Sequence, residues 1–186
     1  MKNIIVITNR KLCNDFETQI QKLCELKVGA IVVREKDLNE KEYRDLFIRT
    51  KRICDKYKVP CRIHNFYNVG IELSCEEIHL PLHVLRENNK EIVDRFNVIG
   101  VSVHTTNEVS EAIKLGATYI TAGHIFETDC KKGIPQKGLK FLEEICNVSS
   151  LPVYAIGGMS INEECVTEMR KHGASGICVM SKAMTI

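Results

Sequence analysis

The chain has 186 residues, of which 44% are hydrophobic and 27% are charged, and its formal net charge is +2 at pH 7. This length suits one domain, and the composition is ordinary for a soluble globular protein. Lysines are dispersed among acidic residues, so we expect neither nucleic acid nor a membrane surface as a partner. The apolar stretch near the N-terminus is too short for a signal peptide, and no run is long enough to cross a membrane.

The sequence contains nine cysteines, which is a high number for this length. The number is odd and no C-x-x-C pair occurs, which argues against a disulfide framework and against a zinc site. Most of these cysteines stand at apolar positions, where a thiol behaves as a small hydrophobic group. Such usage is typical of a reducing compartment, so the sequence predicts a cytoplasmic protein.

Apolar segments rich in β-branched residues recur along the whole chain. Most lack the polar alternation of a half-exposed strand, so we expect strands that are covered on both faces. The expected strands are 4–7, 30–33, 60–64, 77–80, 98–101, 118–121, 152–156 and 176–179.

The segments between these strands carry apolar residues at helical spacing. We expect about seven helices, of which the third, roughly 67–74, is short. Leu85, Ile92 and Phe96 form a sparser stripe, which indicates one helix before the fifth strand.

A Gly-Ala pair recurs between an expected helix and the next expected strand. The three pairs begin at Gly29, Gly116 and Gly173. We expect each glycine to close its helix at positive φ. Repeated units of helix and strand imply parallel strands with right-handed crossovers.

Eight such units predict an α/β fold, a (β/α)8 TIM barrel with eight parallel strands in a single domain over residues 1–186. An open doubly wound sheet is the alternative, and it is weakened because no G-x-G-x-x-G opens a helix after a strand. The chain stops at Ile186, just after the eighth strand, so we expect a truncated or missing final helix. A homodimer is one way to cover the side left bare.

In a barrel of this kind, residues at the carboxyl ends of the strands line one mouth. Here they are polar, cationic and glycine-bearing, as a pocket for a small anion should be. They are Thr8, Asn9, Arg34, Lys36, His64, Asn65, Pro81, His83, Ser102, His104, 124–131, Gly157, Gly158, Met180 and Ser181.

Two of these strand ends have competing interpretations. Gly157 and Gly158 either make a tight turn or expose backbone N–H groups to a ligand. With Ser181 in the next loop we favour a phosphate site. The Arg34-Glu35-Lys36 triplet is either a solvated charge run or a grip on a carboxylate or phosphate, and both interpretations stay open.

The segment 123–133 follows the sixth strand and places histidine, acids, cysteine and lysines directly after an apolar run. We take His124 as the candidate acid/base, with a hydrogen-bonded structural histidine as the alternative. Lys131 or Lys132 is a candidate anion contact, and Cys130 is a weaker candidate nucleophile. The histidines lack metal-ligand spacing, so we expect no metal site.

Four segments together resemble the thiamine phosphate synthase family over nearly the whole chain. Residues 33–38 resemble its Q-L-R-E-K-D-L segment, residues 99–104 its I-G-x-S-x-H, and residues 152–159 its P-V-x-A-I-G-G-I/M. The most specific match is 123–133, which is similar to the form of this loop in the thiazole tautomerase branch of the family. Synthases usually carry proline at the position of His124.

The chain departs from the synthase pattern at three positions. Val32 stands where synthases have glutamine, and Phe66 stands where they have an aspartate that binds magnesium. A second magnesium carboxylate falls near Val84, whose side chain cannot bind a hard cation. The resemblance therefore favours the tautomerase branch over the synthases.

The resemblance implies an isomerase, a thiazole tautomerase that aromatises a carboxythiazole phosphate tautomer without a cofactor. His124 would move the proton in both steps. The implied ligand is a phosphorylated thiazole. The expected substrate-binding residues are Arg34, Lys36, Asn65, Ser102, His104, Thr128, Lys131, Gly158, Met180 and Ser181. The alternatives are a thiamine phosphate synthase that joins thiazole phosphate to pyrimidine pyrophosphate, and a non-catalytic protein that binds thiazole or thiamine phosphate.

Overall fold

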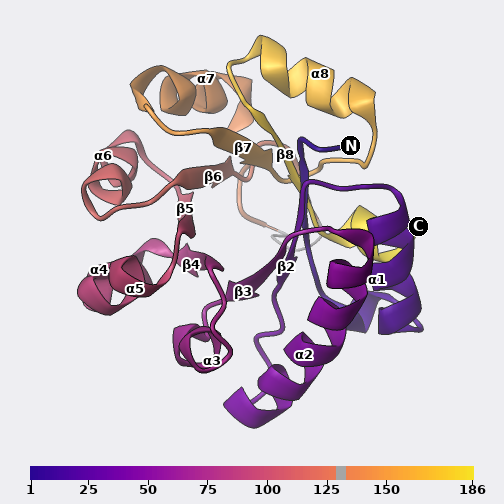
Figure 1. Ribbon diagram of the computed structural model, residues 1–186. Coiled ribbons are helices and arrows are strands. Elements are labelled where there is room, and N and C mark those ends of the chain that lie inside the picture. The colour runs from indigo at the N-terminus through magenta and orange to yellow at the C-terminus, as the bar shows by residue number, and fades with distance from the viewer. Residues whose placement is uncertain (129–132) are drawn as a thin grey trace.

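A computed structural model of the chain describes residues 1–128 and 133–186, and it forms one closed barrel of parallel strands. Strands that follow one another in the sequence are neighbours in the barrel, and β1 closes the ring against β8. The helices lie around the outside (Figure 1). The predicted TIM barrel is confirmed, and the doubly wound sheet is excluded because its edges would not meet.

The strands are β1 Ile4–Ile7, β2 Ala30–Val33, β3 Cys61–His64, β4 Glu77–Pro81, β5 Val98–Val103, β6 Tyr119–Gly123, β7 Val153–Ile156 and β8 Gly176–Val179. The α-helices of the described residues are α1 Phe16–Glu25, α2 Glu40–Tyr57, α3 Tyr67–Glu72, α4 Leu82–Glu87, α5 Asn89–Arg95, α6 Thr106–Lys114, α7 Gly138–Val148 and α8 Glu163–Lys171. Short 3-10 helices follow β1 and β8, at Arg10–Leu12 (η1) and Ser181–Met184 (η3).

The helix before β5 differs from the prediction. Its sparse apolar stripe belongs to two short helices, α4 and α5, which bury Leu85 and Ile92 respectively. They are separated at Asn88, whose backbone angles (φ −124°, ψ 27°) are not helical. The amide side chain of Asn88 donates to the carbonyl of Val84 at 3.1 Å, which satisfies one acceptor at the break.

The three Gly-Ala junctions have two different explanations. Gly116 and Gly173 have φ angles of 87° and 89° and close α6 and α8 as expected. Gly29 does not, because Lys27 takes the left-handed conformation instead, with φ 55°. A Cβ at Gly29 would lie 2.1 Å from the carbonyl oxygen of Lys2, so glycine is required there by close backbone contact.

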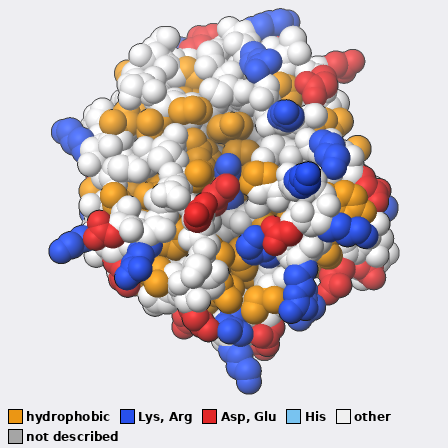
Figure 2. Space-filling view, viewed as in Figure 1, with side chains coloured by type: hydrophobic (Ala, Val, Ile, Leu, Met, Phe, Trp, Pro, Cys, Tyr) orange, Lys and Arg blue, Asp and Glu red, His pale blue; other side chains and the backbone are white. Residues whose placement is uncertain are grey.

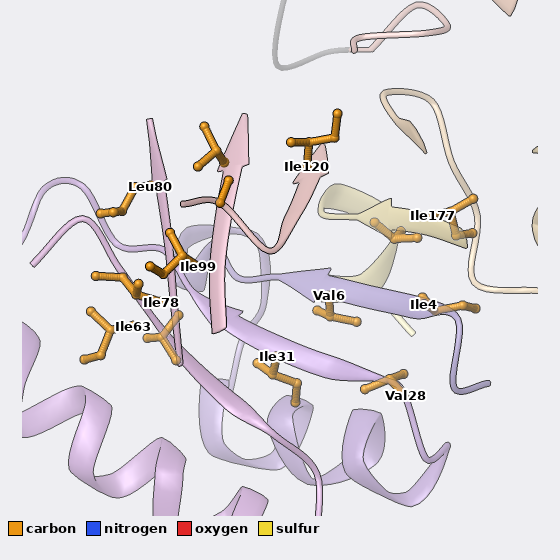
Figure 3. Packing of buried hydrophobic residues seen from close by; sticks show 14 of the residues in the cluster. Ile4, Val6, Val28, Ile31, Ile63, Ile78, Leu80, Ile99, Ile120 and Ile177 are labelled. Atoms are coloured by element: carbon orange, nitrogen blue, oxygen red, sulfur yellow. The ribbon is translucent and has the colours of Figure 1, made fainter. Parts of the chain in front are cut away.

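The strands pack their two faces against different partners. Val6, Ile31 and Ile177 belong to the large cluster between barrel and helices, part of which Figure 3 shows. Ile5 and Val32, at the alternate positions, belong to a smaller cluster inside the barrel. Because both faces are covered, each strand is a continuous run of apolar residues in the sequence. This explains why the strands could be predicted from the sequence.

The residues after β8 form the short 3-10 helix η3. Its Ala183 carbonyl accepts a hydrogen bond of 2.7 Å from the buried side-chain amide of Gln19 on α1. Ala183 and Met184 are buried. A short 3-10 turn therefore covers this part of the barrel. In the part of the chain that the structure describes, no helix is long and apolar enough to span a membrane.

Candidate active site

One side of the mouth holds a pocket of about 250 Å³ formed by the loops after β2, β3 and β4. Lys36 and Asn65, both predicted site residues, are among the residues that line it. Asn65 has a left-handed backbone with φ 66°, which asparagine tolerates better than most residues. The lining residues are Glu35, Lys36, His64, Asn65, Phe66, Pro81 and His83.

Glu35 connects the loops after β1 and β2. It is 3% exposed, and its carboxylate accepts hydrogen bonds from the Thr8 hydroxyl at 2.7 Å and from the Arg10 backbone N–H at 2.9 Å. The Arg10 guanidinium adds a third hydrogen bond at 3.1 Å and also pairs with Asp37. The triplet around Glu35 is therefore no solvated charge run, since its central carboxylate is structural.

Arg34 extends from β2 to the end of β8. Its backbone N–H donates to the Thr8 hydroxyl at 2.9 Å, and its Nη1 lies 3.9 Å from the Met180 sulfur. The loops after β7 and β8 are joined beside it, because Lys182 Nζ donates to Ser160 Oγ at 2.8 Å. A guanidinium thus lies over the loop that carries the predicted phosphate residues.

Gly157 and Gly158 lie close to the segment that follows β6. Their φ angles are 106° and 73°, and a Cβ at Gly157 would lie 2.4 Å from the Cβ of His124. A Cβ at Gly158 would lie 2.6 Å from the Cβ of Phe126. The glycines are therefore required by close packing, and the same packing places His124 and Phe126 against Gly157 and Gly158, which we call the glycine loop.

The imidazole of His124 is 4% exposed, and only one of its two ring nitrogens has a hydrogen-bond partner among the described residues. Its Nε2 lies 3.2 Å from the carbonyl oxygen of Ile134, a geometry in which Nε2 must carry the proton. Its Nδ1 is buried and has no hydrogen-bond partner in the described part of the chain. The ring therefore has one buried nitrogen without a partner among the described residues, and its Cβ lies against Gly157.

The remaining predicted residues have different surroundings. His104 is exposed, and its Nδ1 lies 3.0 Å from the carbonyl oxygen of Gly123. Its own carbonyl accepts a hydrogen bond of 2.6 Å from Lys137, so it connects β5 to the segment after β6. Ser102 is half-buried and faces the barrel interior. Lys131, together with Cys130, lies outside the described residues.

Two buried histidines, His64, which lines the pocket, and His79 on the neighbouring strand β4, have stacked rings with centroids 6.0 Å apart. Burial, together with the charges of Arg62 and Arg34, lowers the pKa of His79 to about 3. Burial likewise holds the pKa of His64 well below its ordinary value, and His79, Arg34 and Lys36 add to the effect. Both rings are therefore neutral near pH 7.

These lowered pKa values predict a loss of stability in weak acid. Between about pH 6.5 and pH 3 the unfolded chain binds protons that the folded His79 does not, so the free energy of unfolding falls as the pH falls. The slope is about 1.4 kcal/mol per pH unit for each such histidine. Denaturation midpoints measured from pH 7 to pH 5 should show a shallower slope for His79→Gln than for the wild type. Equal slopes would contradict the prediction.

The positions at which the resemblance implies magnesium carboxylates do not fit a hard cation. The ring of Phe66 stacks on Tyr43 with centroids 4.3 Å apart, and Val84 is part of α4. The nearby carboxylate of Glu35 is already hydrogen-bonded. Among the described residues, no group of three or more His, Cys, Asp or Glu side chains could hold a metal ion.

The pattern of a known family matches the chain over residues 4–183, and that family is described as thiamine monophosphate synthase. The chain belongs to the thiamine monophosphate synthase family. A thiamine-phosphate synthase of Clostridium acetobutylicum is 30% identical over 97% of this chain and 88% of its own length. One of Clostridium tetani is 32% identical over 81% of this chain and 72% of its own length.

A solved structure of a family member has the same fold. Thiamine phosphate pyrophosphorylase from Pyrococcus furiosus superposes with a TM-score of 0.80 at 25% identity, over 99% of this chain and 95% of that one. These names correct one expectation. The predicted isomerase class is wrong, because the relatives are named as synthases, which are transferases. The resemblance to the family is confirmed, whereas its tautomerase branch is not.

His64 and His83 were expected at the barrel mouth, and both line the pocket. Two residues inside the barrel were not predicted from the sequence. Arg62 and Tyr119 lie inside the barrel, where their side chains are in contact. A signal for Arg62 was available, because it precedes His64 by two residues and so shares its face of the strand.

Proposed function

We propose that this protein is a transferase of thiamine phosphate synthesis, which joins a phosphorylated thiazole to a pyrimidine pyrophosphate at the barrel mouth. The observation that supports this best is that the segment 34–36 contributes a cation on each side. Arg34 lies beside Met180 at the end of β8, and Lys36 lines the pocket, so each is a candidate anion position. A reaction that joins two phosphorylated substrates requires both positions.

The glycine loop is the proposed site of the thiazole phosphate. Backbone N–H groups at Gly158 and Ser181 would approach the phosphate, and the loops after strands seven and eight have this role in many TIM barrels. Arg34 lies beside Met180 and would pair with the phosphate in a bidentate geometry. The half-buried Thr128 follows the segment that packs on Gly158 and completes the proposed contacts.

The pocket of about 250 Å³ is the proposed site of the pyrimidine pyrophosphate. Joining the substrates breaks the bond to pyrophosphate, which leaves with the electron pair, so negative charge develops on its oxygens. Side-chain cations can stabilise such charge where carboxylates for a metal are missing. Lys36 and Arg34 are the proposed cations, and Asn65 and Ser102 are proposed donors to the same oxygens.

His124 is proposed to contact the thiazole. Its Cβ lies against Gly157, and its buried Nδ1 has no partner among the described residues, so this nitrogen is available for a hydrogen bond with the substrate. His104 is proposed to position the end of β6, because its Nδ1 lies 3.0 Å from the carbonyl oxygen of Gly123. Lys131 is proposed as a further cation on sequence grounds alone.

A specific observation favours a second candidate, a non-catalytic protein that binds thiazole or thiamine phosphate. Phe66 and Val84 occupy the positions at which the resemblance implies carboxylates. Such a protein would bind thiazole phosphate or thiamine phosphate at the glycine loop. It would not catalyse the joining of the thiazole to the pyrimidine.

Incubation of the purified chain with thiazole phosphate and pyrimidine pyrophosphate distinguishes the two candidates. We expect thiamine phosphate and pyrophosphate to form, with magnesium and with chelator compared in parallel. Arg34→Ala should lower kcat/KM about a hundredfold, since a charge-assisted hydrogen bond contributes roughly 1.5–3 kcal/mol. Arg44→Ala is the matched control, because Arg44 pairs with Glu72 on the outside of the barrel.

The possible results distinguish the two candidates. Binding of thiazole phosphate by calorimetry without product would favour the non-catalytic protein and reject the transferase. An absence of binding would reject both. Equal activity of Arg34→Ala and Arg44→Ala would remove Arg34 from the proposed site.

A further inference from the structure

Side chains inside the barrel form a hydrogen-bonded chain from β6 through β4 to β5. The Tyr119 hydroxyl lies 2.9 Å from His79 Nδ1, and His79 Nε2 lies 3.0 Å from Ser102 Oγ. Tyr119 and His79 are 4% and 2% exposed, whereas Ser102 is half-buried. We call these three residues the Ser102 relay.

A cation lies at the buried end of the Ser102 relay. The guanidinium carbon of Arg62 is 4.7 Å from the ring centroid of Tyr119, and its Nε donates to Glu77 at 2.7 Å. Gly100 provides the space for Tyr119, since a Cβ there would lie 2.1 Å from the tyrosine ring. An arginine remains protonated in proteins, so the group that lies on the Tyr119 ring is a cation, and Glu77 pairs with it at Nε.

The positive charge decides which nitrogen of His79 carries the proton. The ring is neutral near pH 7 and has a single N–H group. Nδ1 faces Tyr119, on which Arg62 lies, and an N–H directed toward a cation is unfavourable. The favoured tautomer therefore accepts from Tyr119 at Nδ1 and donates from Nε2 to Ser102.

The Ser102 oxygen then receives two hydrogen bonds. One comes from His79, and the other comes from the Thr121 hydroxyl at 3.1 Å. A hydroxyl oxygen has two lone pairs, so both are occupied and the hydroxyl can only donate to any further partner.

We propose that the Ser102 relay makes the Ser102 hydroxyl a dedicated donor to an oxyanion of the bound phosphorylated substrate, with His79 as the positioning residue. The identity of the oxyanion rests on the proposed function, while the direction of the relay does not. Preorganised donors of this kind favour charge that develops on a leaving phosphate oxygen.

The first test reads the tautomer of His79 in the free, full-length protein. Nitrogen-15 NMR of histidine-labelled protein gives separate signals for a protonated and an unprotonated ring nitrogen, and the His79 signals are those lost in His79→Gln. We expect a protonated Nε2 and an unprotonated Nδ1 near pH 7. Tyr119→Phe should raise the population of the other tautomer, while Tyr154→Phe, on the neighbouring ring, should not. A protonated Nδ1 in the wild type would overturn the relay.

The second test measures the affinity for inorganic pyrophosphate by calorimetry. Ser102→Ala and His79→Leu should each weaken binding about tenfold to a hundredfold, and the double variant should lose no more than the larger single loss. His79→Gln keeps an N–H near the Nε2 position and should retain most of the affinity. Thermal unfolding of each variant checks that it is folded.

The outcomes separate the two proposals. If Ser102→Ala weakens binding and a folded His79→Leu does not, or if the two losses add, the relay is overturned and the transferase proposal stands. If the wild type does not bind pyrophosphate, the oxyanion contact is overturned together with the proposed use of that substrate, whatever tautomer His79 shows.

Discussion

Replacement of Glu35 by alanine should lower the free energy of unfolding by about 3 kcal/mol, because it leaves buried donors without their acceptor. The carboxylate accepts from the Thr8 hydroxyl, the Arg10 backbone N–H and the Arg10 guanidinium. For a chain of this size such a loss corresponds to a fall in Tm of roughly 6–12 °C. Glu35→Gln keeps one acceptor oxygen and should lose less. Chemical denaturation at constant m-value is the measurement.

Asp37→Asn is the matched control for Glu35. Asp37 pairs with the same guanidinium at 2.7 Å, but its side chain is 37% exposed and screened by water. We expect only a small change in the denaturation midpoint. The arginine holds the pKa of Asp37 well below its usual range, yet this shift at an exposed site says little about folding. If Glu35→Ala and Asp37→Asn lowered the denaturation midpoint equally, the hydrogen bonds of Glu35 would not stabilise the loops after β1 and β2.

Gly157→Ala should be the most damaging single methyl addition at the mouth. The new Cβ would lie 2.4 Å from the Cβ and 2.8 Å from the Cα of His124, and the φ angle of 106° is strained for any other residue. Overpacking and backbone strain together predict a loss of about 2–4 kcal/mol. His124 must move to relieve the contact, so binding of inorganic phosphate at the glycine loop should weaken as well.

The variant Gly133→Ala distinguishes the cost of backbone strain from the cost of overpacking. Gly133 also has a positive φ angle, 80°, but a Cβ there would meet nothing within 4 Å. It should therefore lose only the backbone cost, about 1 kcal/mol. Denaturation midpoints of the two variants and calorimetry with phosphate make the comparison. Equal losses would show that packing against His124 does not constrain Gly157.

The distribution of polar residues on the surface adds little to these assignments. Charged side chains of both signs are spread over the face shown in Figure 2, with hydrophobic areas between them. This agrees with the net charge of +2 and with the dispersed lysines.

The family and the barrel were predictable from sequence because their signals are local. A strand covered on both faces is a short apolar run, and β1, β2 and β8 began and ended where such runs did. The strand ends that form a barrel mouth follow directly from that assignment. The division of α4 from α5 was missed, because one apolar stripe crosses the break at Asn88.

The enzyme class was predicted wrongly for a related reason. The segment 123–133 and the departures at Val32, Phe66 and Val84 favoured the tautomerase branch, although the family match spans residues 4–183. Loop residues vary among relatives that share a fold and a name. The relatives along the full length correct that choice.

Sequence was sufficient for the eight strands and their parallel order, since hydrophobic periodicity is a local property of the chain. Folding was needed to show that Glu35 is structural, that Arg34 reaches Met180, and that Arg62, Tyr119 and His79 lie in one interior chain. These contacts join residues from different strands. Their energies depend on burial and distance, which exist only once the barrel is closed.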